Sequence, residues 1–255
     1  MDKTVDVGGI NMRYTRECST DSPLAILVFL HGWEGSSRSW EANLAEFRNV
    51  FDCISLDMPG FGVSDEPKNV WGVAEYAQFI REFAQVLNLQ KIVLVGKSFG
   101  GRVAMFYACK WPDTLSKLIL VAAAGIERKS FATQLRIALA KTGKAVFSLL
   151  GQNATESLRG LFYKTTNIKK DKSDYKWEVK KLVTNTNLSG TAENITTPTL
   201  VVWGTDDKVL PLNIGKELSR KIKGSTFLEI QGGHNAHQES SKDFNALITE
   251  YLSRN

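Results

Sequence analysis

Short apolar runs rich in β-branched residues alternate along the chain with longer segments of helical periodicity. The runs are too short for helices and are bounded by glycine, proline or polar residues, so they predict buried strands. They fall at residues 24–32, 51–60, 91–96, 115–125, 198–204 and 225–230. A hairpin is predicted before them, with strands at 3–7 and 10–18 joined by a Gly-Gly turn.

Helical segments separate these predicted strands. Apolar positions recur every three or four residues at 73–89 and at 99–111, and the second segment stops before Pro112. The alternation predicts an α/β fold with a mostly parallel sheet flanked by helices. It breaks at 127–186, where a basic helical segment is followed by a lysine-rich stretch. We therefore predict one α/β core, residues 1–126 and 187–255, with a helical cap inserted at 127–186.

Composition limits the class of protein. A chain of 255 residues with 43% hydrophobic and 23% charged residues fits one large globular α/β domain. The first residues hold no apolar segment of signal-peptide length, and no apolar run is long enough to span a bilayer. The three cysteines, Cys18, Cys53 and Cys109, lack metal-ligand spacing. The sequence thus predicts a cytoplasmic protein without disulfides, metal, cofactor or stable membrane association.

Positive charge is concentrated in the predicted cap. The net charge is +5, and residues 127–181 hold thirteen Lys or Arg against five Asp or Glu. Such a block can attract acidic ligands, lipid or nucleic acid. No basic motif interleaved with aromatic residues accompanies it. A solvated helical face is therefore the favoured interpretation, and no nucleic-acid partner is predicted.

The pentapeptide Gly-Lys-Ser-Phe-Gly at 96–100 lies between a predicted strand and a predicted helix. This is the context of a nucleophile elbow, where a serine occupies a strained turn and glycines two residues away prevent a collision across it. Ser98 is therefore the candidate nucleophile. A serine hydroxyl at neutral pH needs a base to take its proton.

Only three histidines are available as that base: His31, His234 and His237. His234 is favoured because it follows the last predicted strand in a glycine-rich loop that can reach the serine. His31 precedes the loop after the first buried strand, where we expect it to brace the turn. His237 begins the last helix, where a surface or capping role is expected.

An acid and two amide donors complete the predicted constellation. The acid is expected between serine and histidine in chain order, and both Asp206 and Asp207 follow the strand at 198–204. The oxyanion hole is expected from the backbone amides of Trp33, after the first buried strand, and Phe99, after the nucleophile. The side chains of Trp33 and Phe99 are expected to border the substrate pocket.

Five ordered segments resemble the α/β-hydrolase superfamily: HGWEGSSRSW from residue 31, DMPGFGVSD from 57, GKSFGGRVA from 96, WGTDDKVLP from 203 and GGHNAHQE from 232. The family pattern W-G-x-x-D-x-x-x-P puts the acid on Asp207, and the resemblance puts the base on His234 and the oxyanion loop on Trp33. It implies an eight-stranded sheet with the helical cap between strands 6 and 7. It also implies that Asp57 stabilises its loop and does not react.

The resemblance implies a serine hydrolase that cleaves a small carboxylic ester, lactone or thioester through an acyl-enzyme. Dehalogenases and epoxide hydrolases are disfavoured because they carry aspartate at the position of Ser98. Two alternatives stay open. One is a carbon–carbon-bond hydrolase or menaquinone-pathway synthase-like enzyme acting on an anionic substrate. The other is a non-catalytic ligand-binding protein of the same fold.

Two basic residues beside the elbow bear on the substrate. Lys97 either places positive charge near the site or points away from the pocket, and the second interpretation is favoured. Arg102, in the first turn of the following helix, is a candidate partner for a carboxylate. Together with the basic cap they modestly favour an anionic acyl substrate. No other partner is predicted.

Overall fold

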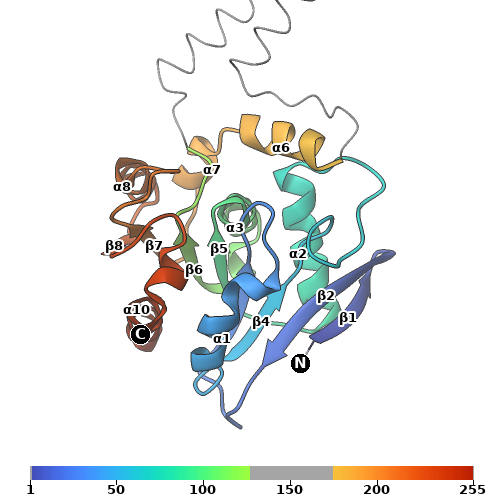
Figure 1. The fold of residues 1–255 in the computed structure, drawn as a ribbon, viewed down its shortest axis with the longest axis horizontal. Coiled ribbons are helices and arrows are strands. Elements are labelled where there is room, and N and C mark those ends of the chain that lie inside the picture. Colours follow the sequence, from blue (N-terminus) through green and yellow to red (C-terminus); the bar gives the residue numbers. More distant parts are fainter. Residues whose placement is uncertain (1, 127–174, 255) are drawn as a thin grey trace, which may run out of the picture. The chain divides into compact units, whose positions relative to one another are not determined.

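An eight-stranded sheet forms the centre of the computed structural model, which describes residues 2–126 and 175–254 (Figure 1). Its strand order is β1-β2-β4-β3-β5-β6-β7-β8. β1 pairs antiparallel with β2, and β2 with β4, while all other neighbours are parallel. The bounds are β1 Asp2–Val7, β2 Ile10–Glu17, β3 Ile26–Leu30, β4 Asp52–Leu56, β5 Ile92–Lys97, β6 Leu115–Val121, β7 Thr199–Gly204 and β8 Thr226–Ile230. The predicted hairpin and mostly parallel sheet are confirmed.

Helices cover both faces of this sheet (Figure 1). α1 (Glu41–Phe47) and α10 (Ser241–Ser253) pack on one face, and α2 (Val73–Val86), α3 (Phe99–Lys110) and α8 (Leu212–Lys221) on the other. α2 and α3 confirm the two helices predicted from periodicity. The shorter helices are η1 (Ser37–Trp40), η2 (Pro112–Thr114), α7 (Ser189–Glu193) and α9 (Ala236–Glu239), and α6 covers Tyr175–Asn185.

Strands β3, β5, β6 and β7 are largely buried on both faces, which explains their continuous apolar sequences. Alternate side chains of each strand point to opposite faces. Those that face α1 and α10 pack with the apolar residues of these helices, and this cluster includes Leu27, Phe29, Val93, Val95, Ile119, Val121, Leu200, Val202, Trp40, Leu44, Phe47, Phe244 and Ile248. The rigid centre fixes the carboxyl ends of the strands, from which the functional loops extend.

The predicted cap, residues 127–186, connects β6 with β7, and most of it lies outside the described residues. Its described end contains α6, while the helical character of the rest and the domain boundaries stay predictions. The basic segment at 130–151 falls entirely outside the described part. Within the described ranges, no helix is both long enough and apolar enough to cross a bilayer.

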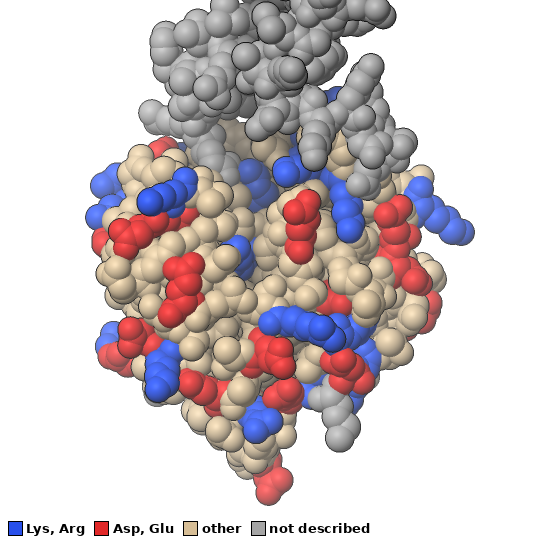
Figure 2. Space-filling model, in the orientation of Figure 1, with Lys and Arg blue, Asp and Glu red and all other residues tan. Residues whose placement is uncertain are grey.

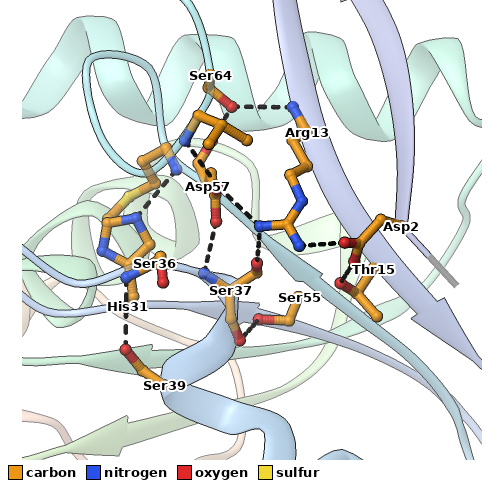
Figure 3. Close-up of polar contacts among 12 residues, drawn as sticks. Asp2, Arg13, Thr15, His31, Ser36, Ser37, Ser39, Ser55, Asp57 and Ser64 are labelled. Atoms are coloured by element: carbon orange, nitrogen blue, oxygen red, sulfur yellow. Dashed lines mark hydrogen bonds and ion pairs between the residues drawn. The ribbon is translucent and has the colours of Figure 1, made fainter.

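A buried network around Asp57 connects the loops that follow β3 and β4 (Figure 3). The Asp57 carboxylate accepts the N–H of Ser37 at 2.6 Å and of Val63 at 3.0 Å, and Arg13 Nη1 lies 3.4 Å away. Burial alone would raise the pKa of Asp57, but these backbone hydrogen bonds hold it below its usual value. Gly62 passes so close, with φ +56°, that a Cβ there would lie 2.1 Å from the carboxylate. Asp57 thus has the loop-stabilising contacts that the resemblance implies.

Candidate active site

Four residues singled out from the sequence follow four different strands at one edge of the sheet. Trp33 follows β3, Ser98 follows β5, Asp207 follows β7 and His234 follows β8. Because these strands are parallel, their carboxyl ends meet at that edge, where α/β proteins bind ligands. The topology therefore brings together residues up to about two hundred positions apart in the chain.

Ser98 occupies the sharp turn between β5 and α3. Its backbone has φ +51° and ψ −106°, a region that non-glycine residues rarely adopt. The turn is tight: a Cβ on Gly96 would lie 2.5 Å from the Gly100 carbonyl, and one on Gly100 would lie 2.5 Å from the carbonyl of Leu30. Hydrogen bonds from Ser98 N to Val121 O and from Gly100 N to the carbonyl of residue 31 hold it in place. The backbone thus has the strained geometry of a nucleophile elbow.

His234 lies between Ser98 and Asp207. Its Nε2 is 3.1 Å from Ser98 Oγ, and its Nδ1 is 2.8 Å from Asp207 Oδ2. A carboxylate can only accept, so the Nδ1–H donates to Asp207 and leaves Nε2 as an acceptor for the serine hydroxyl. Burial lowers the pKa of His234, although the hydrogen bond to Asp207 opposes this shift. The imidazole is therefore neutral at pH 7 and can accept the hydroxyl proton.

The structure distinguishes the two aspartates between which the sequence left a choice. Asp207 is 5% exposed, and its Oδ1 accepts the N–H groups of Val209 and Leu210 at 2.9 and 2.8 Å. These bonds orient the carboxylate so that Oδ2 meets the histidine. Asp206 is exposed and accepts from Gln231 Nε2 at 2.8 Å. Only Asp207 contacts His234, as the family pattern predicted.

Two backbone amides next to the serine have no acceptor among the described residues. Phe99 is the first residue of α3, so its N–H has no partner inside the helix and lies at the positive end of the helix dipole. The N–H of Trp33 makes no hydrogen bond to the described part of the chain. Both amides are thus free to hold a developing negative charge, which is the role that the sequence predicts for them.

His31 braces the loop that carries Trp33. Its Nδ1–H donates to the Gly32 carbonyl at 2.7 Å, and its Nε2 accepts from the N–H of Met58 at 3.0 Å. Burial lowers the pKa of His31 to about 4, so the ring is neutral. A trans peptide points its C=O and N–H in opposite directions. Holding the Gly32 carbonyl therefore also fixes the direction of the Trp33 N–H.

Aromatic rings surround the predicted oxyanion loop. The ring of Trp33 packs edge-on against Phe99 and Phe61, with centroids 5.5 and 5.1 Å apart, and Phe99 also contacts Tyr76. Phe99 is 3% exposed, so its side chain is mainly part of this cluster, whereas the less buried Trp33 borders a cavity. Phe61 and Tyr76 are not among the site residues predicted from the sequence. Phe61 lies within the quoted DMPGFGVSD segment, which could have indicated it.

The remaining candidates have different surroundings. Arg102 is buried and donates to the carbonyls of Val183 and Thr186 at 2.8 and 3.0 Å. The prediction of a surface or capping role for His237 is wrong, because its ring is 1% exposed and packs against Trp40. Within the described ranges, no group of three or more His, Cys, Asp or Glu is placed to hold a metal ion.

Comparisons with known proteins agree with this architecture. The model of a family described as alpha/beta hydrolase fold matches residues 25–241. An uncharacterized protein of Mycobacterium tuberculosis is 34% identical over 124 residues, which are 49% of this chain but only 36% of that relative's length. The 2-hydroxy-6-oxo-6-phenylhexa-2,4-dienoate hydrolase of Comamonas testosteroni is 27% identical over 89% of this chain and 87% of its own. The crystal structure of an enol-lactonase from Burkholderia xenovorans LB400 superposes with a TM-score of 0.76 at 18% identity, covering 99% of this chain and all of the other. The chain belongs to the alpha/beta hydrolase fold family.

Proposed function

We propose that this protein is a serine hydrolase in which Ser98 is the nucleophile, His234 the base and Asp207 the acid. The observation that carries the proposal is the continuous hydrogen-bonded chain from Ser98 Oγ through both nitrogens of His234 to Asp207. Family membership supports it, as does the hydrolase activity in the name of the Comamonas relative. A strained serine backbone is a further sign of function, since such strain persists only where the surrounding structure enforces it.

The proposed reaction begins when Ser98 Oγ attacks a carbonyl carbon and its proton moves to His234 Nε2. Asp207 keeps the proton on Nδ1 and stabilises the imidazolium that forms. The N–H groups of Trp33 and Phe99 stabilise the negative charge that develops on the carbonyl oxygen. His234 then gives its proton to the leaving group, and an acyl-enzyme remains. Water, activated by the same histidine, releases the acid and restores the hydroxyl.

A small carboxylic ester is our first candidate substrate, with lactones and thioesters in the same reaction class. The second candidate is an unsaturated oxo acid, and the observation that favours it is the name and coverage of the Comamonas dienoate hydrolase. Residues 127–186 would act as the cap that selects among these substrates. The buried contacts of Arg102 with two carbonyls argue against its use as a substrate carboxylate partner.

A fluorophosphonate probe tests the nucleophile directly. We expect the wild type to be labelled at Ser98, and Ser98→Ala to lose both labelling and nearly all turnover of an activated ester. Competition by a panel of esters, thioesters, lactones and oxo acids then ranks the candidate substrates. A folded wild-type protein that is neither labelled nor active on the panel would favour the non-catalytic ligand-binding alternative.

A further inference from the structure

A partly enclosed cavity of about 280 Å³ lies beside the candidate triad, between the loop that carries Trp33, η1 and α9. His234 lines one part of it, while the residue before the nucleophile, Lys97, lines another. Other lining residues include Trp33, Glu34, Trp40 and His237. The hydrolytic mechanism uses only His234 and the Trp33 amide from this set, so most of the lining has no assigned role.

Lys97 contributes a positive charge without a partner. Its side chain lies against the loop after β3, because a Cβ at Gly32 would be 2.9 Å from Lys97 Cδ and 3.1 Å from Nζ. Lys97 Nζ makes neither a hydrogen bond nor an ion pair with any described residue. Burial lowers the pKa of Lys97, while Asp207 and Glu239 oppose the shift. A mostly buried ammonium without a partner is costly, which makes it an attractive site for an anion.

Three further side chains of this lining hold buried nitrogens without a hydrogen-bond partner among the described residues. These nitrogens are Nε1 of Trp33, Nε1 of Trp40 and both ring nitrogens of His237. The rings of Trp40 and His237 pack together with centroids 4.4 Å apart, and Trp40 and His237 are 0% and 1% exposed. The Ser39 carbonyl lies near His237 and accepts from Gln238 Nε2, and its second lone pair is available to the His237 ring. Buried polar groups are normally paired, so these orphans need an explanation.

The unpartnered groups are mainly donors. Lys97 is partly exposed and lines the cavity, whereas Trp40 Nε1 and the ring nitrogens of His237 are buried behind its wall. The nearby carboxylates have their own contacts. Asp207 accepts from His234, and Glu239 accepts the N–H of Gly233 at 2.6 Å. Glu34 lines the cavity but is exposed, so solvent screens its charge. Acidic and basic side chains are interspersed over the described face in Figure 2, so the attraction for an anion is local.

We propose that this cavity is a binding site for a small carboxylate, held by Lys97 Nζ. A carboxylate has one negative charge and two acceptor oxygens, which matches a single ammonium with its three N–H donors. The cavity volume is near the lower end for small-molecule sites, so a short organic acid fits better than a bulky ligand. A doubly charged phosphate would bring a second negative charge close to Asp207 and Glu239.

The carboxylate can come from two sources. It can be the charged end of a substrate whose carbonyl carbon reaches Ser98, or it can be a free acid, such as the product of hydrolysis. The substrate-borne case rests on the proposed function. Binding of a free carboxylate does not, so the two proposals can fail separately.

Direct binding is measured with trifluoroacetate as the probe, by ¹⁹F NMR line broadening on the wild-type protein at constant ionic strength. We expect saturable binding that acetate competes away and neutral acetamide does not. Lys97→Met should weaken it by about tenfold or more, the effect expected for losing a charged hydrogen bond. Lys180→Met is the matched control, because Lys180 lies over the Trp33 ring, 5.7 Å from its centroid, but is outside the cavity lining.

A second arm separates the sources. The ratio of kcat/KM for an ester with a terminal carboxylate to that for its neutral counterpart is compared in the wild type and in Lys97→Met. A wild-type preference for the charged ester that Lys97→Met loses indicates a substrate-borne carboxylate. Absence of that preference, together with inhibition or activation of neutral ester turnover by acetate, indicates a free acid.

Two results overturn the site itself. One is the absence of saturable trifluoroacetate binding to the wild type, which would mean that the polar groups are merely hydrated. The other is binding that persists unchanged in Lys97→Met. Thermal unfolding checks that this variant is folded, and we expect its Tm to equal or exceed that of the wild type, because methionine replaces a buried unpaired charge. Labelling by the fluorophosphonate probe reports separately on Ser98.

Discussion

His234 and His237 lie three residues apart, one in the loop after β8 and one in α9, yet their surroundings are opposite. Both ring nitrogens of His234 are hydrogen bonded, one to Asp207 and the other to Ser98. Neither nitrogen of His237 has a partner among the described residues, and its ring packs between Trp40 and other aromatic groups. The first environment is suited to moving a proton, while the second shields both ring nitrogens from water.

The pKa values of the two histidines show how the difference arises. Burial lowers both, but only for His234 does a hydrogen-bonded carboxylate act strongly in the other direction. The pKa of His237 falls to about 3, which fixes its ring as neutral over the physiological range. The presence of a carboxylate within hydrogen-bond distance therefore distinguishes His234, which can exchange protons, from His237, which cannot.

The largest expected effect comes from replacing the carboxylate that accepts the Nδ1–H of His234. Asp207→Asn replaces an acceptor by an amide that can donate to Nδ1, which favours the wrong tautomer. We expect kcat for an activated ester to fall by about 10³- to 10⁴-fold. The neighbouring Asp206→Asn is the matched control, and its kcat should stay close to that of the wild type. Equal losses in both variants would contradict the assignment of Asp207.

A smaller effect is expected from loosening the oxyanion loop. His31→Leu removes the donor to the Gly32 carbonyl and the acceptor for the buried Met58 N–H. We expect the free energy of unfolding to fall by about 1–3 kcal/mol and kcat to fall by up to about 10²-fold. His31→Gln, whose amide offers both a donor and an acceptor, should restore part of kcat. A kcat that is unchanged in a folded His31→Leu protein would show that the brace does not position the Trp33 amide.

Much of this site could be predicted from the sequence because its signals are local. The elbow glycines, the loop after β3 and the W-G-x-x-D spacing each lie within one short segment. The structure adds that Ser98, Asp207 and His234 meet, which follows from parallel strands whose carboxyl ends share an edge. The sequence made Arg102 a candidate carboxylate partner. Its guanidinium instead donates to two backbone carbonyls from a distant part of the chain, and no local pattern in the sequence indicates these contacts.

The surroundings of His237 could not be predicted for a related reason. Its place at the start of the last predicted helix suggested a surface or capping role, but η1 brings Trp40, nearly two hundred residues away in the chain, against its ring. Burial of that kind depends on tertiary packing and leaves no periodic signal in a four-residue helix. The same packing produces the cavity that Lys97 lines.

Burial of His237 should make the free energy of unfolding fall as the pH is lowered. Below pH 6.5 the unfolded chain binds a proton at His237 that the folded protein cannot bind until about pH 3. The wild type therefore loses stability as pH falls through this window, by about 1.4 kcal/mol per pH unit from this group. In His237→Phe, we expect the loss in unfolding free energy between pH 7 and pH 5 to shrink by roughly 2 kcal/mol. Urea unfolding at both pH values measures it, and an unchanged difference would contradict the buried neutral ring.

The smallest expected effect is that of the Lys97 charge on the pKa of His234. Burial is the main cause that lowers the pKa of His234, and the positive charge of Lys97 lowers it further, while Asp207 and Glu239 raise it. The acid limb of kcat/KM for a neutral ester reports His234 in the free enzyme, so its midpoint should lie below 6.5. Lys97→Met removes a charge that disfavours the imidazolium, and the midpoint should therefore move to higher pH, by less than about one unit.

The exposed Lys208→Met is the matched control for this shift, because solvent screens its charge and the midpoint should hardly move. Acetate sharpens the test, since a carboxylate bound beside Lys97 would neutralise the same charge. In the wild type it should raise the midpoint in the same direction as Lys97→Met, whereas in Lys97→Met it should have no further effect. A midpoint that falls in Lys97→Met would mean that this charge does not act on His234. If acetate shifts the midpoint equally in both proteins, the shift is an effect of ionic strength. A carboxylate bound in the cavity would then have no effect on the pKa of His234.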